Sequence, residues 1–124
     1  MPVRQITLEY LRSHPCHIFV YGDNLLHRGC RGAAQFRSEP NTYGFVTKKF
    51  PSSKVEAFYR PAEYRPVFEQ ELSRLMVEIV GHGQRTYMIS PVGSGLANRF
   101  KIWERVIEPG LERLRPIENV VFLY

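Results

Sequence analysis

Apolar runs alternate with helical patterns along this chain, and that alternation constrains its fold more than any other feature. Four runs rich in β-branched and aromatic residues predict strands, at 17–21, 43–47, 86–90 and 119–124. Three patterns between them predict helices, at 33–37, 67–80 and 102–114. Such an order favours an α/β sandwich with a mixed or mostly parallel sheet.

Prolines and glycines mark where this pattern is interrupted. The segment 48–66 is predicted to be a loop because it holds three prolines and two serines. Gly81 and Gly83 are expected to end the long helix, and Pro109 and Gly110 to kink or break the last one. No repeat or linker-like segment divides the chain, so a single domain over residues 1–124 is expected.

Composition and charge narrow the classes of partner and compartment. The formal net charge of +5 favours an anionic partner, which could be nucleic acid, a nucleotide or a phosphorylated small molecule. A solvated basic surface is the alternative. Cys16 and Cys30 are the only cysteines, so neither a disulfide framework nor a zinc site is expected. Because no signal peptide or membrane span is visible, we expect a cytoplasmic protein. No metal or cofactor is expected either.

Two glycine-bearing loops, 22–32 and 91–99, leave predicted strands and run into predicted helices. Ligands of open α/β sheets bind at the carboxyl ends of strands, where these loops begin. Gly93 and Gly95 allow several backbone N–H groups to converge on one phosphate, next to a helix N-terminus. A tight turn without a ligand is the alternative interpretation of the same residues.

The first of these loops adds polar side chains to its glycines. Asn24 has donors and an acceptor for ribose hydroxyls or a base edge, and Asp23 can accept from a hydroxyl or an amine. Gly29 and Gly32 allow the close approach of an anion to the helix that follows. The alternative is that Asp23 and Asn24 only close a turn, as such residues commonly do.

In order along the chain, the motifs "FVYGDNL", "RGCRGAAQFR", Thr47-Lys48-Lys49 and "MISPVGSGLANRF" resemble the macrodomain family. The chain is most similar to small macrodomain-like proteins of phages and bacteria, and to the branch that removes ADP-ribose from DNA or carboxylate side chains. The resemblance covers about Ile18 to Leu114. It implies a three-layer α/β/α sandwich that binds ADP-ribose in a cleft across the strand ends.

The resemblance also implies which residues would form that site. The implied ligand-binding positions are Gly22, Asp23, Asn24, Gly29, Gly32, Ala33, Thr47, Val92, Gly93, Ser94, Gly95, Leu96, Ala97 and Asn98. In the DNA-directed branch, a lysine of a similar Thr-Lys-Lys stretch attacks the anomeric carbon, which implies Lys48 as the nucleophile. Adjacent residues of a strand point to opposite sides, so only one of the two lysines can face the cleft. Two surface lysines are the alternative.

The sequence departs from that branch at the catalytic acid. The position after Gly-Ser-Gly-Leu is Ala97, and the next residue, Asn98, cannot take up a proton as a carboxylate does. Asp23 is the carboxylate that could serve instead. Binding of ADP-ribose would survive the loss of the acid, because main-chain amides hold most of the diphosphate.

Three functions follow as hypotheses. The first is a binder of ADP-ribose, or of a related nucleotide, that could also hydrolyse ADP-ribose from DNA or protein. The second is a basic nucleic-acid-binding module without catalysis, although the Lys and Arg residues form no dense run. The third is a phosphatase acting on ADP-ribose 1″-phosphate. The residues leave open whether the chain is an enzyme and whether it forms oligomers.

Overall fold

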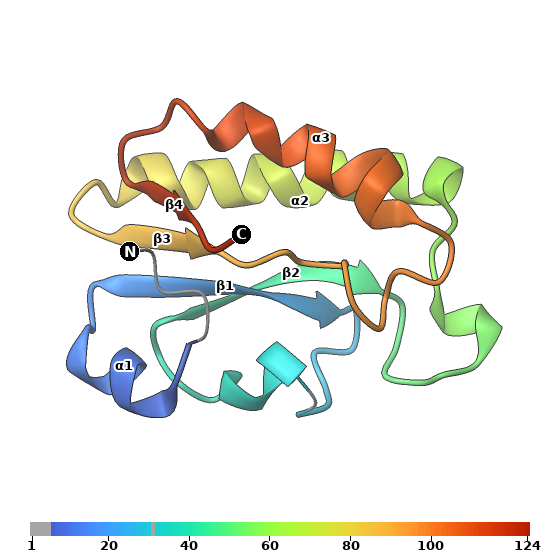
Figure 1. Cartoon of the computed structure of the whole chain (residues 1–124), viewed down its shortest axis with the longest axis horizontal. Coiled ribbons are helices and arrows are strands. Elements are labelled where there is room, and N and C mark those ends of the chain that lie inside the picture. Colours follow the sequence, from blue (N-terminus) through green and yellow to red (C-terminus); the bar gives the residue numbers. More distant parts are fainter. Residues whose placement is uncertain (1–5, 31) are drawn as a thin grey trace.

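Four strands form one sheet in the order β2-β1-β3-β4 in the computed structural model, which describes residues 6–30 and 32–124 (Figure 1). The strands are β1 (His17–Asn24), β2 (Thr42–Lys48), β3 (Thr86–Ile89) and β4 (Val120–Phe122). All neighbouring strands pair in parallel, for example Phe19 with Met88 and Met88 with Val121. The α/β class is therefore confirmed, while the sheet is parallel between its strands rather than mixed.

Helices lie on both faces of this sheet (Figure 1). One face carries α2 (Pro61–Gly81) and a continuous helical segment made of η3 (Trp103–Ile107), α3 (Glu108–Leu111) and η4 (Glu112–Leu114). The other face carries α1 (Leu8–Ser13) and the 3-10 helix η1 (Gly32–Phe36). A further 3-10 turn, η2 (Val55–Ala57), follows β2. No helix within the described ranges combines the length and apolarity that crossing a membrane requires.

Helix α2 begins earlier than the sequence predicts. The loop expected over 48–66 ends at Arg60, and residues 61–66 are helical. Pro61 stands at the first helical position, where its fixed φ suits a helix and its missing N–H costs nothing. Pro66 removes one helical hydrogen bond, but buried Tyr64 and Phe68 on either side hold this turn against the core. Tertiary packing thus outweighs the local effect of proline.

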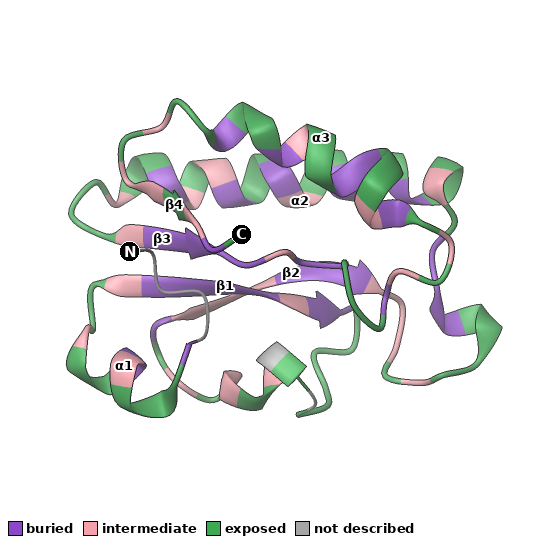
Figure 2. Ribbon diagram, viewed as in Figure 1, coloured by how far each residue is buried: buried purple, intermediate pink, exposed green. Residues whose placement is uncertain are grey.

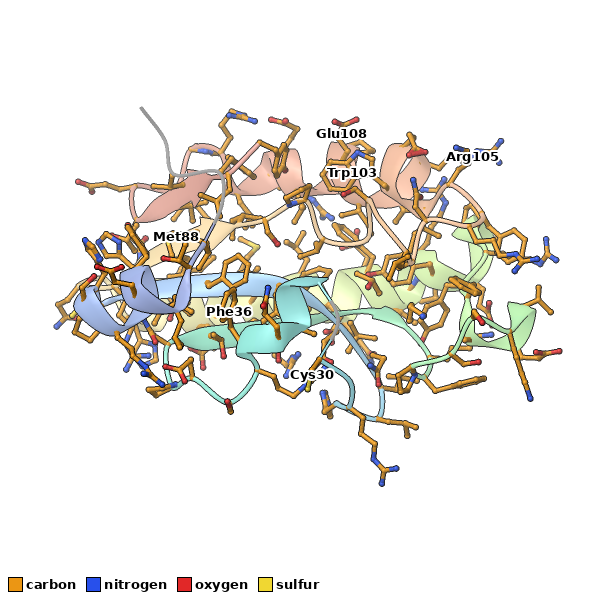
Figure 3. All side chains as sticks on the ribbon, turned by 60° about the horizontal axis from the view of Figure 1, so that its bottom comes forward. Cys30, Phe36, Met88, Trp103, Arg105 and Glu108 are labelled. Atoms are coloured by element: carbon orange, nitrogen blue, oxygen red, sulfur yellow. The ribbon has the colours of Figure 1, made fainter. Side chains whose placement is uncertain are left out.

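Alternating side chains of β1 divide the core between the two faces of the sheet. Ile18 and Val20 face α2 in the larger cluster, while Phe19 and Tyr21 lie in a smaller cluster beneath α1 and η1. Phe36 and Met88, both labelled in Figure 3, belong to this smaller cluster. Burial is concentrated on the strands and on the sheet-facing sides of α2 and α3 (Figure 2). The strong core on one face fixes the strand ends from which the loops emerge.

Three helical details differ from the prediction. The short helix expected at 33–37 is the 3-10 helix η1, and α1 lies in a segment for which the sequence pattern predicts no element. Helix α1 is capped by Thr7, whose side chain accepts a hydrogen bond from the Tyr10 backbone N–H at 3.0 Å. The last segment is helical through residue 114, and α3 includes Pro109 and Gly110, where the sequence predicts a kink or break; a π-helical turn changes to α-helix immediately before Pro109.

Candidate functional site

A cleft of about 880 Å³ lies at the carboxyl ends of β1, β2 and β3. Its walls are the strand ends, a first cleft loop (residues 25–30), the segment 49–54 and a second cleft loop (residues 91–98). Strands β1 and β3 are neighbours, yet the chain leaves them toward opposite faces of the sheet (Figure 1). Open α/β sheets bind ligands at such a reversal of strand connections. The volume lies in the range of small-molecule sites.

Most of the site residues predicted from the sequence meet in this cleft. Those that line it are Gly22, Asp23, Asn24, Gly29, Gly32, Thr47, Lys48, Val92, Gly93, Gly95, Leu96 and Ala97. Ser94 and Asn98 lie in the second cleft loop but do not line the cleft. The side chain of Ala33 falls outside what the structure describes. Two loops far apart in the sequence are thus brought together.

Asp23 is buried at the end of β1 and its carboxylate already has several partners. Oδ1 lies 2.6 Å from Nη1 of Arg37 and accepts the Asn24 backbone N–H at 2.8 Å. Oδ2 lies 2.8 Å from Nδ1 of His27. Gly44 of β2 leaves room for it, since a Cβ there would stand 2.5 Å from Oδ2. The carboxylate therefore holds the surrounding loop in place in this structure, and it is the only carboxylate among the described residues that line the cleft.

Arg37 is the residue that sequence reasoning missed. Its Nε donates to the carbonyl of Gly29 at 3.1 Å and its Nη2 to that of Arg28 at 3.1 Å. Its guanidinium also lies over the Tyr21 ring, 5.5 Å from the centroid. Together with the Asp23 contact, these bonds give each of the three guanidinium nitrogens a partner. Arg37 therefore connects the end of β1 to the first cleft loop and has little capacity left for a ligand.

Both polar atoms of the Asn24 amide are used within the same loop. Nδ2 donates to the carbonyl of Arg28 at 2.7 Å, and Oδ1 accepts the Leu26 backbone N–H at 3.0 Å. This is the turn chemistry that the sequence leaves open as an alternative for this residue. The first cleft loop also contains His27 and Gly29 at positive φ, 54° and 97°. Side chains, rather than regular secondary structure, thus determine its shape.

The two lysines at the end of β2 point to different sides. Lys48 lines the cleft, where its Nζ donates to the carbonyl of Ser52 at 2.8 Å and lies 4.8 Å from the centroid of the Phe58 ring. Lys49 instead pairs with Glu63 of α2 at 2.7 Å. Phe58 is the one aromatic ring among the described residues of the cleft wall. Lys48 therefore brings a positive charge beside an apolar surface, which suits an anionic ligand with an aromatic group.

The second cleft loop is held mainly by its own backbone turns. Ser94 N–H donates to the carbonyl of Pro91 at 3.1 Å, and Asn98 N–H to that of Gly95 at 3.0 Å. Between these bonds, the backbone N–H groups of Gly93, Gly95, Leu96 and Ala97 donate to no acceptor within residues 6–30 and 32–124. Unpaired N–H groups close together in a turn are typical of an anion-binding nest.

Glycine is required where this loop meets the end of β1. Gly93 has a φ of 80°, and a Cβ there would stand 2.5 Å from Cδ1 of Ile107. A Cβ on Gly22 would stand 3.3 Å from Oγ1 of Thr47 and 3.5 Å from the nitrogen of Gly93. The hydroxyl of Thr47 donates to the carbonyl of Asp23 at 3.3 Å. Three segments therefore converge tightly at the base of the cleft.

Asn98 bonds to the start of the last helical segment rather than lining the cleft. Its Oδ1 accepts the Trp103 backbone N–H at 2.9 Å, and its Nδ2 donates to Oε1 of Glu104. Ala97 is buried, and its methyl group cannot transfer a proton. Residues 97 and 98 therefore supply no carboxylate to the cleft. Among the described residues, no group of three or more His, Cys, Asp or Glu side chains is arranged to hold a metal ion.

Comparison with known protein families gives one match. The model of a family of unknown function (DUF7831) matches residues 2–98. The chain belongs to DUF7831. No curated protein and no solved structure matches it. The DUF7831 match contains every described residue that lines the cleft, from Gly22 to Ala97, and ends before the helical segment 103–114.

Proposed function

We propose that this member of DUF7831 binds ADP-ribose, or a closely related nucleotide, in the cleft, with the diphosphate on the second cleft loop. The observation that carries the proposal is the set of unpaired backbone N–H groups at Gly93, Gly95, Leu96 and Ala97. A diphosphate has several acceptor oxygens and can satisfy such donors without any charged side chain. The macrodomain-like fold implied by the sequence resemblance is part of this proposal.

Charge and shape around the loop support the same ligand class. Arg28 and Lys48 line the cleft, so an anion there is favoured electrostatically. Phe58 gives the cleft an apolar wall next to Lys48. A nucleotide combines an anionic group with a flat apolar base, and these two kinds of surface match its two parts. The volume of about 880 Å³ is sufficient for a ligand of this size.

The proposal concerns binding, because the two candidate catalytic side chains are engaged elsewhere. Asp23 contacts Arg37 and His27, and Lys48 donates to a carbonyl of the neighbouring segment. A lysine becomes a nucleophile only when its amine loses its proton. The Lys48→Arg variant keeps the positive charge and removes the nucleophilic amine. Release of ADP-ribose from modified DNA or protein by the wild type, but not by this variant, would extend the proposal to a glycohydrolase.

Calorimetric titration with ADP-ribose tests binding, with AMP and ADP as comparison ligands. We expect ADP-ribose to bind more tightly than ADP, and Gly95→Glu to weaken it more than tenfold through charge repulsion at the loop. Gly83→Glu is the matched control, because a Cβ at either glycine would meet nothing within 4 Å and Gly83 lies far away in the turn after α2. Equal affinity of both variants and the wild type would show that the second cleft loop does not hold the ligand.

A further inference from the structure

A second, shallower hollow of about 520 Å³ lies beside the cleft. Phe58 lines both of them, so the hollow and the cleft adjoin at this ring. The hollow is bounded by the segment 49–60, the start of α2 and Phe100, which follows the second cleft loop. Figures 1 and 3 place the start of the helical segment 103–114 at this same end of the molecule. The hollow therefore extends the cleft toward an exposed edge.

Arginine side chains stack on the aromatic ring at this edge. The Arg60 guanidinium lies 4.1 Å from the centroid of the Phe100 ring. The Arg99 guanidinium lies 5.8 Å from the same ring and 5.6 Å from that of Phe58. Both arginines are exposed. Nucleic-acid bases stack on flat guanidinium and aromatic surfaces of this kind.

Several cations around the hollow have no carboxylate within ion-pair distance. Among the described residues, Lys54, Arg60, Arg99 and Lys101 form no ion pair, in contrast to Arg74, Arg113 and Arg115. Examples of the paired class are Arg113 with Glu69 and Arg115 with Glu112. At the hollow itself, Lys49 is the paired exception, and its hydrogen bond lowers the pKa of Glu63. These four cations line the hollow or neighbour its lining residues in sequence, and Glu56 and Glu63 are the carboxylates among the described residues of that lining.

We infer that this edge, which we call the basic rim (Lys54, Arg60, Arg99, Phe100 and Lys101), is a docking surface for single-stranded nucleic acid. The unpaired cations contact phosphates, and the rings and guanidinium groups stack with bases. A duplex would keep its bases stacked internally and could not use the Phe100 and Arg60 faces. An anionic membrane would use the charge but not the stacking surfaces. The inference does not depend on nucleotide binding in the cleft.

Fluorescence polarisation with a labelled oligothymidine strand tests the basic rim. We expect binding that weakens as salt rises, because bound phosphates release counterions. The double variant Arg60→Glu, Arg99→Glu is expected to lose more than tenfold in affinity, with a salt slope reduced by about 1.4, since each lost phosphate contact of a single strand lowers it by about 0.7. Phe100→Ala is expected to lose about tenfold without a change in slope, because it removes stacking and no charge.

The double variant Arg113→Glu, Arg115→Glu is the control, because it changes the net charge equally at and just after η4, away from the rim. Its affinity for the strand is expected to stay within about threefold of the wild-type affinity. Thermal melting first shows that each variant is folded. Absence of binding by the wild type, equal losses in both double variants, or tighter binding of a duplex of equal length would overturn the inference. Rim-dependent binding of phosphatidylserine vesicles without strand binding would also overturn it. ADP-ribose titration of the rim variant reports separately on the cleft.

Discussion

The two cleft loops are built in opposite ways. The first cleft loop is held by the side chains of Asp23, Asn24 and Arg37, which flank it, and the polar atoms of these side chains are used in doing so. In the second cleft loop, two backbone turns hold the chain, and four N–H groups between them have no acceptor in the described residues. A loop whose polar groups are satisfied internally forms a wall. A loop whose N–H groups are unpaired can receive an anion.

Removal of the Asp23 carboxylate is expected to have the largest effect, because the first cleft loop depends on it. Asp23→Ala leaves Arg37, whose side chain is 20% exposed, without its buried partner. Breaking a buried ion pair from one side costs about 3–5 kcal/mol. The free energy of unfolding in urea measures this loss. Arg12→Ala, which removes an exposed pair with Glu39, should cost less than about 1 kcal/mol. Similar small losses in both variants would contradict the assigned role.

Backbone geometry, rather than side-chain pairing, should determine the stability of the second cleft loop. Gly93→Ala introduces a Cβ at a φ of 80° and against Ile107, so we expect a loss of about 2 kcal/mol in stability. ADP-ribose affinity should fall as well, because the loop must shift. Gly95→Ala is the matched control: its Cβ would meet nothing within 4 Å, and we expect a change below about 0.5 kcal/mol. Equal effects at both positions would show that the loop tolerates rearrangement.

Substitution of one asparagine beside each loop, Asn24 and Asn98, compares how much a single side-chain amide contributes to stability in the two places. Asn24→Ala removes two hydrogen bonds from a buried side chain and should cost about 2 kcal/mol. Asn98→Ala removes the acceptor for the Trp103 N–H at a helix start and should cost about 1 kcal/mol. Urea unfolding of both variants gives the order. A larger loss at Asn98 would mean that the start of the last helical segment matters more than the first cleft loop.

Much of this fold can be predicted from the sequence because its signals are local. The four strands follow from β-branched and aromatic runs bounded by turn residues, and the parallel arrangement follows from the helical patterns between them. The predicted start of α2 is wrong because Pro61 and Pro66 suggest a loop, while the burial that overrides them involves Tyr64 against β2. Local propensity does not contain that long-range contact.

The candidate site is predictable in position but not in its internal connections. Glycine-bearing loops after two strands indicate the cleft, and strand alternation correctly separates Lys48 from Lys49. The role of Arg37 could not be found, because its partners Asp23, Arg28 and Gly29 depend on how the 3-10 helix η1 returns to the sheet. Gly44 is the one residue whose sequence position indicates part of this arrangement. A glycine within a strand indicates close approach of a neighbouring group, which here is the Asp23 carboxylate.

Ser94→Ala is expected to have the smallest effect, and it tests whether a side-chain hydroxyl or backbone N–H groups donate to the ligand. The Ser94 hydroxyl donates to the carbonyl of Pro91, which the Ser94 backbone N–H also contacts, and the side chain is exposed. Ser94→Ala should therefore change stability by less than about 0.5 kcal/mol and ADP-ribose affinity by less than twofold. Calorimetry measures the affinity. A tenfold loss would mean that a hydroxyl holds the phosphate, and both cleft loops would then act through their side chains.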